Sequence, residues 1–291
     1  MTDWKDAIQV VLSVFDPDGK YCRHAGVVVT SLFSRASSRV CVTILHDETL
    51  TEDNKARFLK TADVFGQAVR FIDVSPAISS MPFSVDDIAG NLTRGTLFRL
   101  LMPDVIDAAK VIYLDCDIAV NLDIAELWNI DVEGFSLAAA PDQVVIDQRG
   151  KTHYKIRAWA MEYDDRKYFN AGVLLMNLDR IRQRKINLVE SAVIFFKCYR
   201  LCNYYADQDF LNSLFCGDTL LIDERFNSIK NLPDIENTIL HFAGGGKPWK
   251  PHSDERRRDC FYWETLLRSE WRDQFISAMF DMLRDRERCH P

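Results

Sequence analysis

The sequence predicts an α/β fold in which helices flank both faces of a mostly parallel, Rossmann-like sheet. Three observations lead to this prediction. Apolar runs typical of buried strands alternate with segments of helical periodicity through the first 120 residues. Turn signals such as DPDGK separate these segments. The chain has 291 residues, of which 47% are hydrophobic, so it can bury the core of one large domain.

The elements of the first half follow from local patterns. The run IQVVLSVF is apolar almost throughout and ends at a turn signal, as a buried strand does. Thr51 is a candidate N-cap and Gly66 a candidate stop for the amphipathic helix between them. Strands that alternate with helices pair in parallel. In chain order we expect strands over 8–15, 38–47, 68–75 and 111–120, and helices over 25–36, 50–66 and 93–106.

The second half is less regular. We expect strands over 135–145 and 168–178, a helix over 207–217, and a short apolar run over 238–251 that three glycines interrupt. Beyond Asp254 the chain is dense in charged and aromatic residues, which predicts two amphipathic helices. We therefore expect a main domain over 1–250 and a C-terminal helical extension over 251–291 that packs on or beside it.

The composition argues against several classes of protein. The net charge of −7, from 36 basic and 43 acidic residues, disfavours a nucleic-acid partner because phosphate binding needs a basic face. We find no signal-peptide pattern and no apolar stretch near the roughly 20 residues that span a bilayer. The eight cysteines form no CxxC pair, which favours reduced thiols over a zinc site or disulfides. We therefore expect a cytoplasmic protein.

The C-terminal segment is a candidate for membrane contact. Residues 254–291 contain eight arginines and nine acidic residues. This balance suits an anionic membrane face less well than a polybasic segment does. We expect this segment to form helices that pack on the main domain. At most, it would make peripheral contact with the inner face of the membrane.

Two carboxylates interrupt the apolar stretch VIYLDCDIAV. Burying Asp115 and Asp117 together costs free energy unless something neutralises them. Oxygen ligands two residues apart can both reach one Mg²⁺ or Mn²⁺ ion. An Asp-x-Asp triplet is weak evidence by itself, because such triplets are common in solvated loops. Here the apolar flanks, and a position toward the carboxyl end of a parallel strand, favour a metal site.

A second candidate lies in the stretch HFAGGGKPW. A lone histidine such as His241 is more often a core or surface residue than a ligand. The three glycines that follow allow close backbone approach, and their amides can face an anion. Lys247 then supplies a point charge suited to phosphate. A flexible turn with a surface lysine is the alternative, but it does not explain why these residue types occur together.

Several stretches together resemble one protein family. In order they are FDPDGKY with VVVTSL, TLFRLLMP, VIYLDCDIAV with LDIAELW, YFNAGVLLMNL, DQDFLN, RFN and HFAGGGKPW. Single stretches are weak evidence, but the ordered set over about the first 250 residues is specific. The chain resembles the family 8 glycosyltransferases, the retaining group that includes bacterial lipopolysaccharide galactosyl- and glucosyltransferases. The resemblance implies a GT-A fold, a nucleotide-sugar donor that is usually UDP-linked, and a Mn²⁺ ion, with Mg²⁺ as the alternative.

The resemblance also implies roles for single residues. Asp115, Asp117 and His241 would be the metal ligands. The chain departs from the family at Asp16 and Pro17, where small residues are usual, so base recognition is open at this turn. We expect the side chain of Cys116 to point away from the metal, with only its backbone near the donor. The donor contacts implied by the resemblance are Asp18, Tyr21, Arg99, Asp115, Cys116, Asp117, Asn170, Ala171, Gly244 and Lys247.

The resemblance places Asp207 and Gln208 beside the anomeric carbon as the catalytic pair. Retention needs a nucleophile on the opposite face, such as the carboxylate of retaining glycosidases, or a front-side attack. Gln208 is an amide and a poor nucleophile, so we favour front-side attack. Acidic residues at a helix N-terminus also suit the helix dipole, and the two roles are compatible. Asp142 is the candidate acceptor contact; the alternative is a turn residue after Pro141.

The predicted function is transfer of a hexose from UDP-glucose or UDP-galactose to an acceptor hydroxyl. The acceptor would be a bacterial surface glycan or glycolipid, as in lipopolysaccharide biosynthesis, and the metal would stabilise the UDP leaving group. Two alternatives stay open. One is a metal-dependent phosphotransferase or phosphatase, which also uses an Asp-x-Asp triplet but usually on the first strand. The other is a nucleotide-sugar-binding protein without catalysis.

Overall fold

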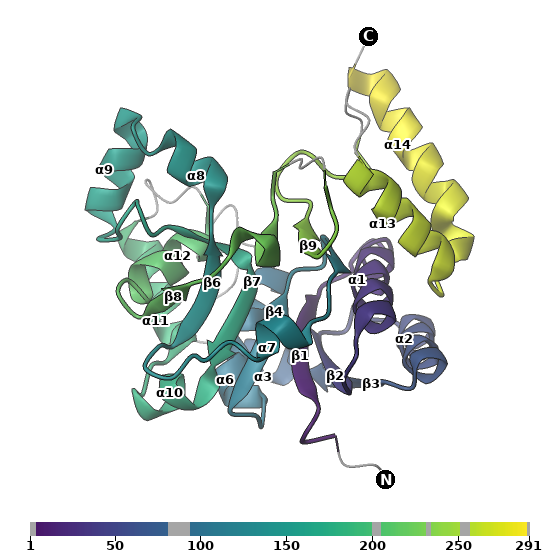
Figure 1. Ribbon diagram of the computed structural model, residues 1–291, viewed down its shortest axis with the longest axis horizontal. Coiled ribbons are helices and arrows are strands. Elements are labelled where there is room, and N and C mark those ends of the chain that lie inside the picture. Colours follow the sequence, from purple (N-terminus) through teal and green to yellow (C-terminus); the bar gives the residue numbers. More distant parts are fainter. Residues whose placement is uncertain (1–3, 81–93, 200–204, 231–233, 251–256, 290–291) are drawn as a thin grey trace.

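A seven-stranded, mostly parallel sheet forms the centre of the computed structural model (Figure 1). The structure describes residues 4–80, 94–199, 205–230, 234–250 and 257–289. The strand order is β3-β2-β1-β4-β7-β6-β8, and every neighbouring pair is parallel except the two pairs that β7 makes with β4 and β6. The strands are β1 (Ile8–Val14), β2 (Val40–His46), β3 (Ala68–Asp73), β4 (Lys110–Leu114), β6 (Leu137–Pro141), β7 (Phe169–Asn177) and β8 (Thr219–Leu221).

Successive side chains along the strands point to opposite faces of the sheet and pack into two hydrophobic cores, one on each face. On β4, Ile112 and Leu114 join the core beneath α1 (Cys22–Arg35), α2 (Glu52–Phe65) and α13 (Arg257–Arg268). Val111 and Tyr113 face the opposite core. That core packs on η1 (Arg99–Leu101), α6 (Met102–Val105), α10 (Leu178–Gln183), α11 (Leu188–Cys198) and α12 (Asp207–Leu214). The predicted α/β class with helices on both faces is confirmed.

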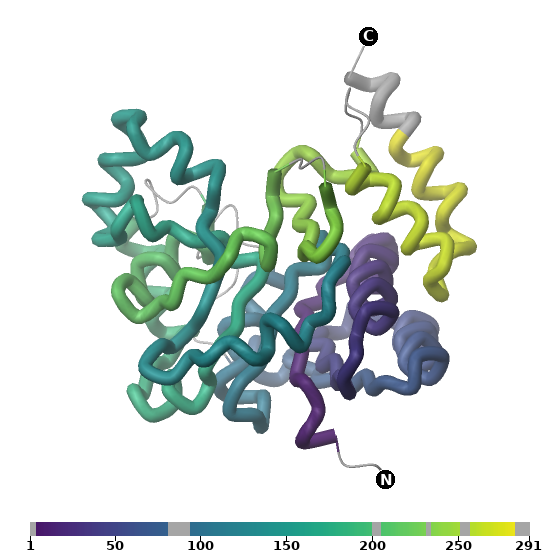
Figure 2. Tube along the Cα trace, viewed as in Figure 1, coloured from purple at the N-terminus to yellow at the C-terminus, as the bar shows by residue number. Residues whose placement is uncertain are grey.

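The stretch 111–120, expected as one strand, forms two strands in different sheets. β4 ends at Leu114, and the chain turns at Asp115–Asp117 before β5 (Ile118–Asn121) begins. β5 leaves the main sheet and pairs antiparallel with β9 (Thr238–His241), with Ile118 opposite His241. Figure 2 shows these two segments, far apart in the chain, lying side by side. Both strands are apolar and buried, so apart from the turn Asp115–Asp117 itself the hydrophobic pattern does not mark the change of sheet.

Other expected elements are confirmed or corrected in detail. Thr51 caps α2 by accepting from the backbone of Asn54, and Gly66 ends it in the left-handed conformation, φ 62°. The helix expected over 93–106 is three short pieces, α5 (Arg94–Phe98), η1 and α6, with Pro103 in the first turn of α6; residue 93 lies outside the described residues. The strand expected over 135–145 is shorter, and Asp142 begins the helix α8 (Gln143–Gln148) instead.

Several short helices were not expected. They are α3 (Ser75–Ser79), α7 (Ala125–Trp128), α9 (Thr152–Ala160), α10 and α11, together with η2 (Glu224–Asn227) and η3 (Arg272–Gln274). The C-terminal segment forms α13 and α14 (Phe275–Cys289), and α13 packs against α1. Six of the eight cysteines are described and free; Cys202 and the side chain of Cys289 lie outside the description.

Candidate active site

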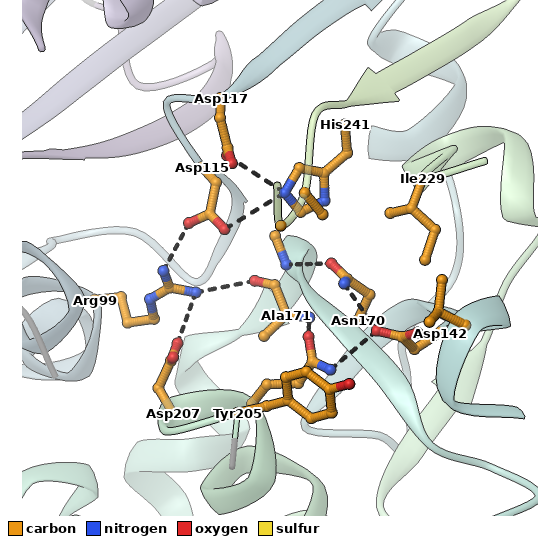
Figure 3. A pocket seen from close by; sticks show the side chains of 15 residues that line it. Arg99, Asp115, Asp117, Asp142, Asn170, Ala171, Tyr205, Asp207, Ile229 and His241 are labelled. Atoms are coloured by element: carbon orange, nitrogen blue, oxygen red, sulfur yellow. Dashed lines mark hydrogen bonds and ion pairs between the residues drawn. The ribbon is translucent and has the colours of Figure 1, made fainter. Parts of the chain in front are cut away.

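Three side chains gather where β4, β5 and β9 meet. Asp115, Asp117 and His241 each offer a ligand atom, and these atoms lie within 4.8 Å of one another. Nε2 of His241 is 3.3 Å from Oδ1 of Asp117 and 4.0 Å from Oδ2 of Asp115 (Figure 3). Two carboxylates and an imidazole suit a divalent cation such as Mn²⁺. The residues that the sequence marked for a metal are therefore brought together.

The backbone around this cluster explains its geometry. Because β5 crosses into the second sheet, Asp117 and His241 stand at neighbouring strand ends, and the amide of Phe242 donates to the carbonyl of Asp117 at 2.9 Å. Gly172 on β7 leaves the room that the histidine ring occupies. A Cβ atom at Gly172 would lie 2.3 Å from Cε1 of His241, closer than atoms can approach. The cluster thus depends on a glycine that is not itself a ligand.

The orientation of His241 is fixed by a chain of hydrogen bonds that begins at the backbone. The amide of Gly172 donates to Oδ1 of Asn170 at 2.9 Å, so this atom is an acceptor. Nδ2 of Asn227 donates to the same oxygen at 2.9 Å, which turns Oδ1 of Asn227 toward Nδ1 of His241, also at 2.9 Å. Nδ1 must therefore carry a proton, and Nε2 is the ring nitrogen that faces the two carboxylates.

Asn227 was not among the residues expected at the site. It lies in η2, within the RFN stretch that contributed to the resemblance, so that stretch was the available signal. Asn227 is buried, and its amide contacts a neighbour at each end. An asparagine near a turn is common in any sequence, which is why its position alone did not identify it.

Charges around Asp117 hold it ionised. Burial alone would raise the pKa of its carboxyl, but His241 and Lys247 outweigh that effect and hold the pKa well below its usual range. Lys247 contacts Oδ2 of Asp117 directly. The loop after β9 thus places the ammonium group of Lys247 beside the Asp-Asp-His cluster. An anionic ligand bound at the cluster would also contact this group.

Arg99 joins the two halves of the site. Its guanidinium lies 2.6 Å from Oδ1 of Asp115 and 3.0 Å from Oδ2 of Asp207, and it donates to the carbonyl of Ala171 at 3.0 Å. Burial raises the pKa of Asp207 to about 6, although Arg99 acts in the opposite direction. The ring of Tyr113 lies against the guanidinium, with its centroid 4.4 Å away. One cation therefore pairs with a predicted metal ligand and a predicted catalytic carboxylate.

A second network fixes Gln208. Its Oε1 accepts from the amide of Ala171 at 3.1 Å, and its Nε2 donates to Oδ2 of Asp142 at 3.0 Å. Asn170 donates to the same oxygen of Asp142, whose other oxygen caps α8. Just before this pair, Ala206 has φ 46° and ψ −116°, a strained conformation for a residue with a Cβ. The strain is localised at the turn that presents Asp207 and Gln208.

Two adjoining cavities share Arg99 and Asp115 as walls. The first, about 420 Å³, is lined by the Asp-Asp-His cluster and by the residues of the second network, together with Gly244. The second, about 330 Å³, is lined by Asp18, Tyr21 and Cys116 among others. The thiol of Cys116 donates to the carbonyl of Ser13 at 3.3 Å, away from the cluster. All the expected donor residues except Lys247 line one of these cavities, and Lys247 contacts the cluster.

The departure at Asp16 and Pro17 has a structural explanation. Asp16 is buried and accepts from the amides of Tyr21 at 2.6 Å and Cys22 at 3.2 Å, which caps the start of α1. A carboxylate in that position also suits the positive end of the helix. Asp16 thus holds the turn that carries Asp18 and Tyr21, and Pro17 lines the second cavity beside them.

Comparison with known proteins bears directly on this arrangement. The sequence model of Glycosyl transferase family 8 matches residues 13–253, which include every candidate site residue. The chain belongs to this family. Among solved structures, this family 8 glycosyltransferase is similar to the galactosyltransferase LgtC in complex with donor and acceptor sugar analogues, with a TM-score of 0.73 and 25% identity, over 92% of this chain and 100% of that one. The fold is therefore GT-A, as expected.

Two curated relatives extend the comparison. General stress protein A of Bacillus subtilis is 26% identical over 286 residues, which covers 89% of this chain and 93% of that protein. The lipopolysaccharide 1,3-galactosyltransferase of Salmonella typhimurium is 23% identical over 251 residues, which covers 80% of this chain and 71% of that protein. The name of the Salmonella relative agrees with glycosyl transfer, the class of activity that the family indicates, whereas the name of the Bacillus relative states no activity. Among the described residues, no helix is long and apolar enough to cross a membrane.

Proposed function

We propose that this glycosyltransferase moves a hexose from a UDP-sugar, UDP-glucose or UDP-galactose, to an acceptor hydroxyl with retention at the anomeric carbon. One observation carries the proposal: the Asp-Asp-His cluster lies where the two cavities meet. A nucleotide sugar would fit this arrangement of two cavities with a cation site between them, because its anionic diphosphate joins a nucleoside at one end to a sugar at the other. The similarity to a galactosyltransferase solved with donor and acceptor sugar analogues supports this reading.

The donor would lie across both cavities. The nucleoside would occupy the second cavity, beside Asp18 and Tyr21 and near the backbone of Cys116. The diphosphate would lie at the cluster, beside Gly244 and Lys247. The sugar would occupy the first cavity, which is lined by Arg99, Asn170 and Ala171. Because Arg99 borders both spaces, it would contact the donor at the junction.

Asp115, Asp117 and His241 would hold the cation. When bound, Mn²⁺, or Mg²⁺ as the alternative, supplies positive charge that stabilises the UDP leaving group. Lys247 would add a second positive charge on the diphosphate side. Nε2 of His241 is available as a ligand because Nδ1 is committed to Asn227.

The geometry of Gln208 favours front-side attack. Both ends of its side-chain amide form hydrogen bonds, to Ala171 and Asp142. The amide is therefore fixed in place and is not free to act as a nucleophile. In the proposed step the bond from the anomeric carbon to the diphosphate oxygen breaks. The acceptor oxygen bonds to the same face, and its proton passes to the leaving diphosphate. Asp207 and Gln208 would position the sugar and stabilise the cationic ring.

Asp142 lines the first cavity. Both of its carboxylate oxygens already accept hydrogen bonds, one from the backbone of α8 and the other from Asn170 and Gln208. We propose that Asp142 faces the acceptor while holding the amide of Gln208 in place. The acceptor we propose is a bacterial surface glycan or glycolipid, a proposal that the name of the Salmonella relative, lipopolysaccharide 1,3-galactosyltransferase, supports.

Slow hydrolysis of the donor tests this function without knowledge of the acceptor. The protein is incubated with UDP-glucose, UDP-galactose and GDP-mannose, each with Mn²⁺ or with EDTA, and release of the nucleoside diphosphate is measured. We expect release from one UDP-hexose with Mn²⁺ only, and the α-anomer of the free sugar as the first product. Absence of both binding and hydrolysis for every UDP-sugar with Mn²⁺ would overturn the proposal.

A further inference from the structure

The helix α9 presents an apolar surface to solvent. Its inner face, with Tyr154, Arg157 and Ala158, is buried, whereas Ile156 and Trp159 lie on the opposite face. Trp159 is 84% exposed, the largest value among the large hydrophobic side chains that the structure describes, and Ile156 is 56% exposed. Leaving an indole in water forgoes a free energy that burial would provide. The exposed face of α9 therefore has the character of a contact surface.

This face is also basic. Arg149, Lys151 and Lys155 are exposed around the apolar pair, and His153 is exposed beside them. No acidic residue occurs between Gln148 and Met161 in a chain whose net charge is −7. The three cations form no ion pair with any carboxylate in the described part of the chain. The positive charge is thus available to a negatively charged partner.

The helix is held rigidly against the rest of the protein. Nη2 of Arg157 lies 2.7 Å from each oxygen of Asp209, which is fully buried in α12. The hydroxyl of Tyr154 lies 3.1 Å from that of Tyr205. Trp159 therefore cannot turn inward without breaking these contacts. The preceding helix α8 carries Val144, which lines the first cavity, and Tyr205, the contact of Tyr154, lines it too, so α9 lies beside the wall of the site.

We propose that the exposed face of α9 docks on the surface of an anionic lipid bilayer. Trp159 and Ile156 would enter the headgroup region, and the lysines and arginine would contact the anionic headgroups, the pattern of an interfacial amphipathic helix. A protein partner is disfavoured because lysine is depleted in the cores of protein interfaces. This placement puts the lipid surface beside the first cavity. It follows, if the proposed glycosyl transfer is also right, that the acceptor is carried on a lipid.

Sedimentation with vesicles tests the docking surface separately from the enzyme activity. The full chain is mixed with vesicles of phosphatidylcholine alone or with 30% phosphatidylglycerol, at low and at 0.5 M salt. One variant, I156A/W159A, removes the apolar pair, and a second, K151E/K155E, reverses two charges. The matched control is I276A/F280A on α14, where Ile276 and Phe280 are 66% and 67% exposed. Circular dichroism and UDP affinity establish that each variant is folded.

We expect wild type and the α14 control to bind the anionic vesicles equally, and neutral vesicles weakly. I156A/W159A should bind at least tenfold more weakly, and K151E/K155E at least about twentyfold, since each basic residue near an anionic surface contributes about fivefold in affinity. UDP affinity should be unchanged in all of them. Absence of binding by wild type, equal binding to neutral vesicles, or a loss in the α14 control with α9 variants unaffected would each overturn the proposal.

Discussion

Nδ1 of His241 lies 2.9 Å from Oδ1 of Asn227, and this contact fixes which nitrogen of the ring faces the two carboxylates. Replacing Asn227 with alanine removes the acceptor while leaving all three candidate ligands. We expect Asn227→Ala to weaken binding of Mn²⁺ about 10- to 100-fold, the usual cost of losing a residue that orients a ligand. Titration calorimetry with Mn²⁺ and UDP measures the change.

The control for this prediction is Asn129→Ala, since Asn129 is exposed at the end of α7. It should bind Mn²⁺ as wild type does. Unchanged metal affinity in Asn227→Ala would show that the asparagine does not orient His241.

Gly172 is predicted to tolerate no side chain. A methyl group there would overlap the ring of His241 and approach Oδ2 of Asp115, at 2.3 Å and 3.0 Å respectively. We expect Gly172→Ala to displace the histidine, to reduce metal-dependent UDP binding by at least tenfold, and to lower the free energy of unfolding by about 1–3 kcal/mol, the usual cost of overpacking. Gly150→Ala is the matched control, because a Cβ there meets no atom within 4 Å. Equal UDP affinity in the two variants would contradict the account.

The raised pKa of Asp207 makes stability depend on pH. Burial raises this pKa from 3.8 to about 6, so the folded protein holds a proton that the unfolded chain has already released between these values. The free energy of unfolding should therefore fall as pH rises from about 4 to 6, by roughly 3 kcal/mol in total, since one pKa unit corresponds to about 1.4 kcal/mol. Above the pKa of the folded state the loss is complete.

Asp207→Asn removes this titration. Chemical denaturation of wild type and Asp207→Asn, in EDTA between pH 4 and 7.5, measures the difference between their free energies of unfolding. We expect the variant to gain relative to wild type as pH rises through this window. A difference that stays constant with pH would show that Asp207 has an ordinary pKa.

The sequence predicted the class of the fold because apolar runs typical of strands alternate with segments of helical periodicity. It indicated Asp115 and Asp117 because these carboxylates interrupt an apolar run, whereas His241 was assigned as a ligand through the resemblance to the family. It did not predict that residues 111–120 divide between two sheets, since both halves are equally buried. It missed Asn227 and the necessity of Gly172, because these act through contacts with His241 that form only after distant strands pair. The helices α8 and α9 are short, and their pattern is weak without the network that holds them.

The central claim is that the Asp-Asp-His cluster binds a divalent cation together with the donor diphosphate. Titration of UDP into wild type, His241→Ala and the exposed-histidine control His153→Ala, each with Mn²⁺ and with EDTA, tests it most directly. The account predicts UDP binding that requires Mn²⁺ in wild type and His153→Ala, and that is lost in His241→Ala while the circular dichroism spectrum is retained. UDP affinity that is the same with EDTA as with Mn²⁺, or unchanged in a folded His241→Ala, would contradict it.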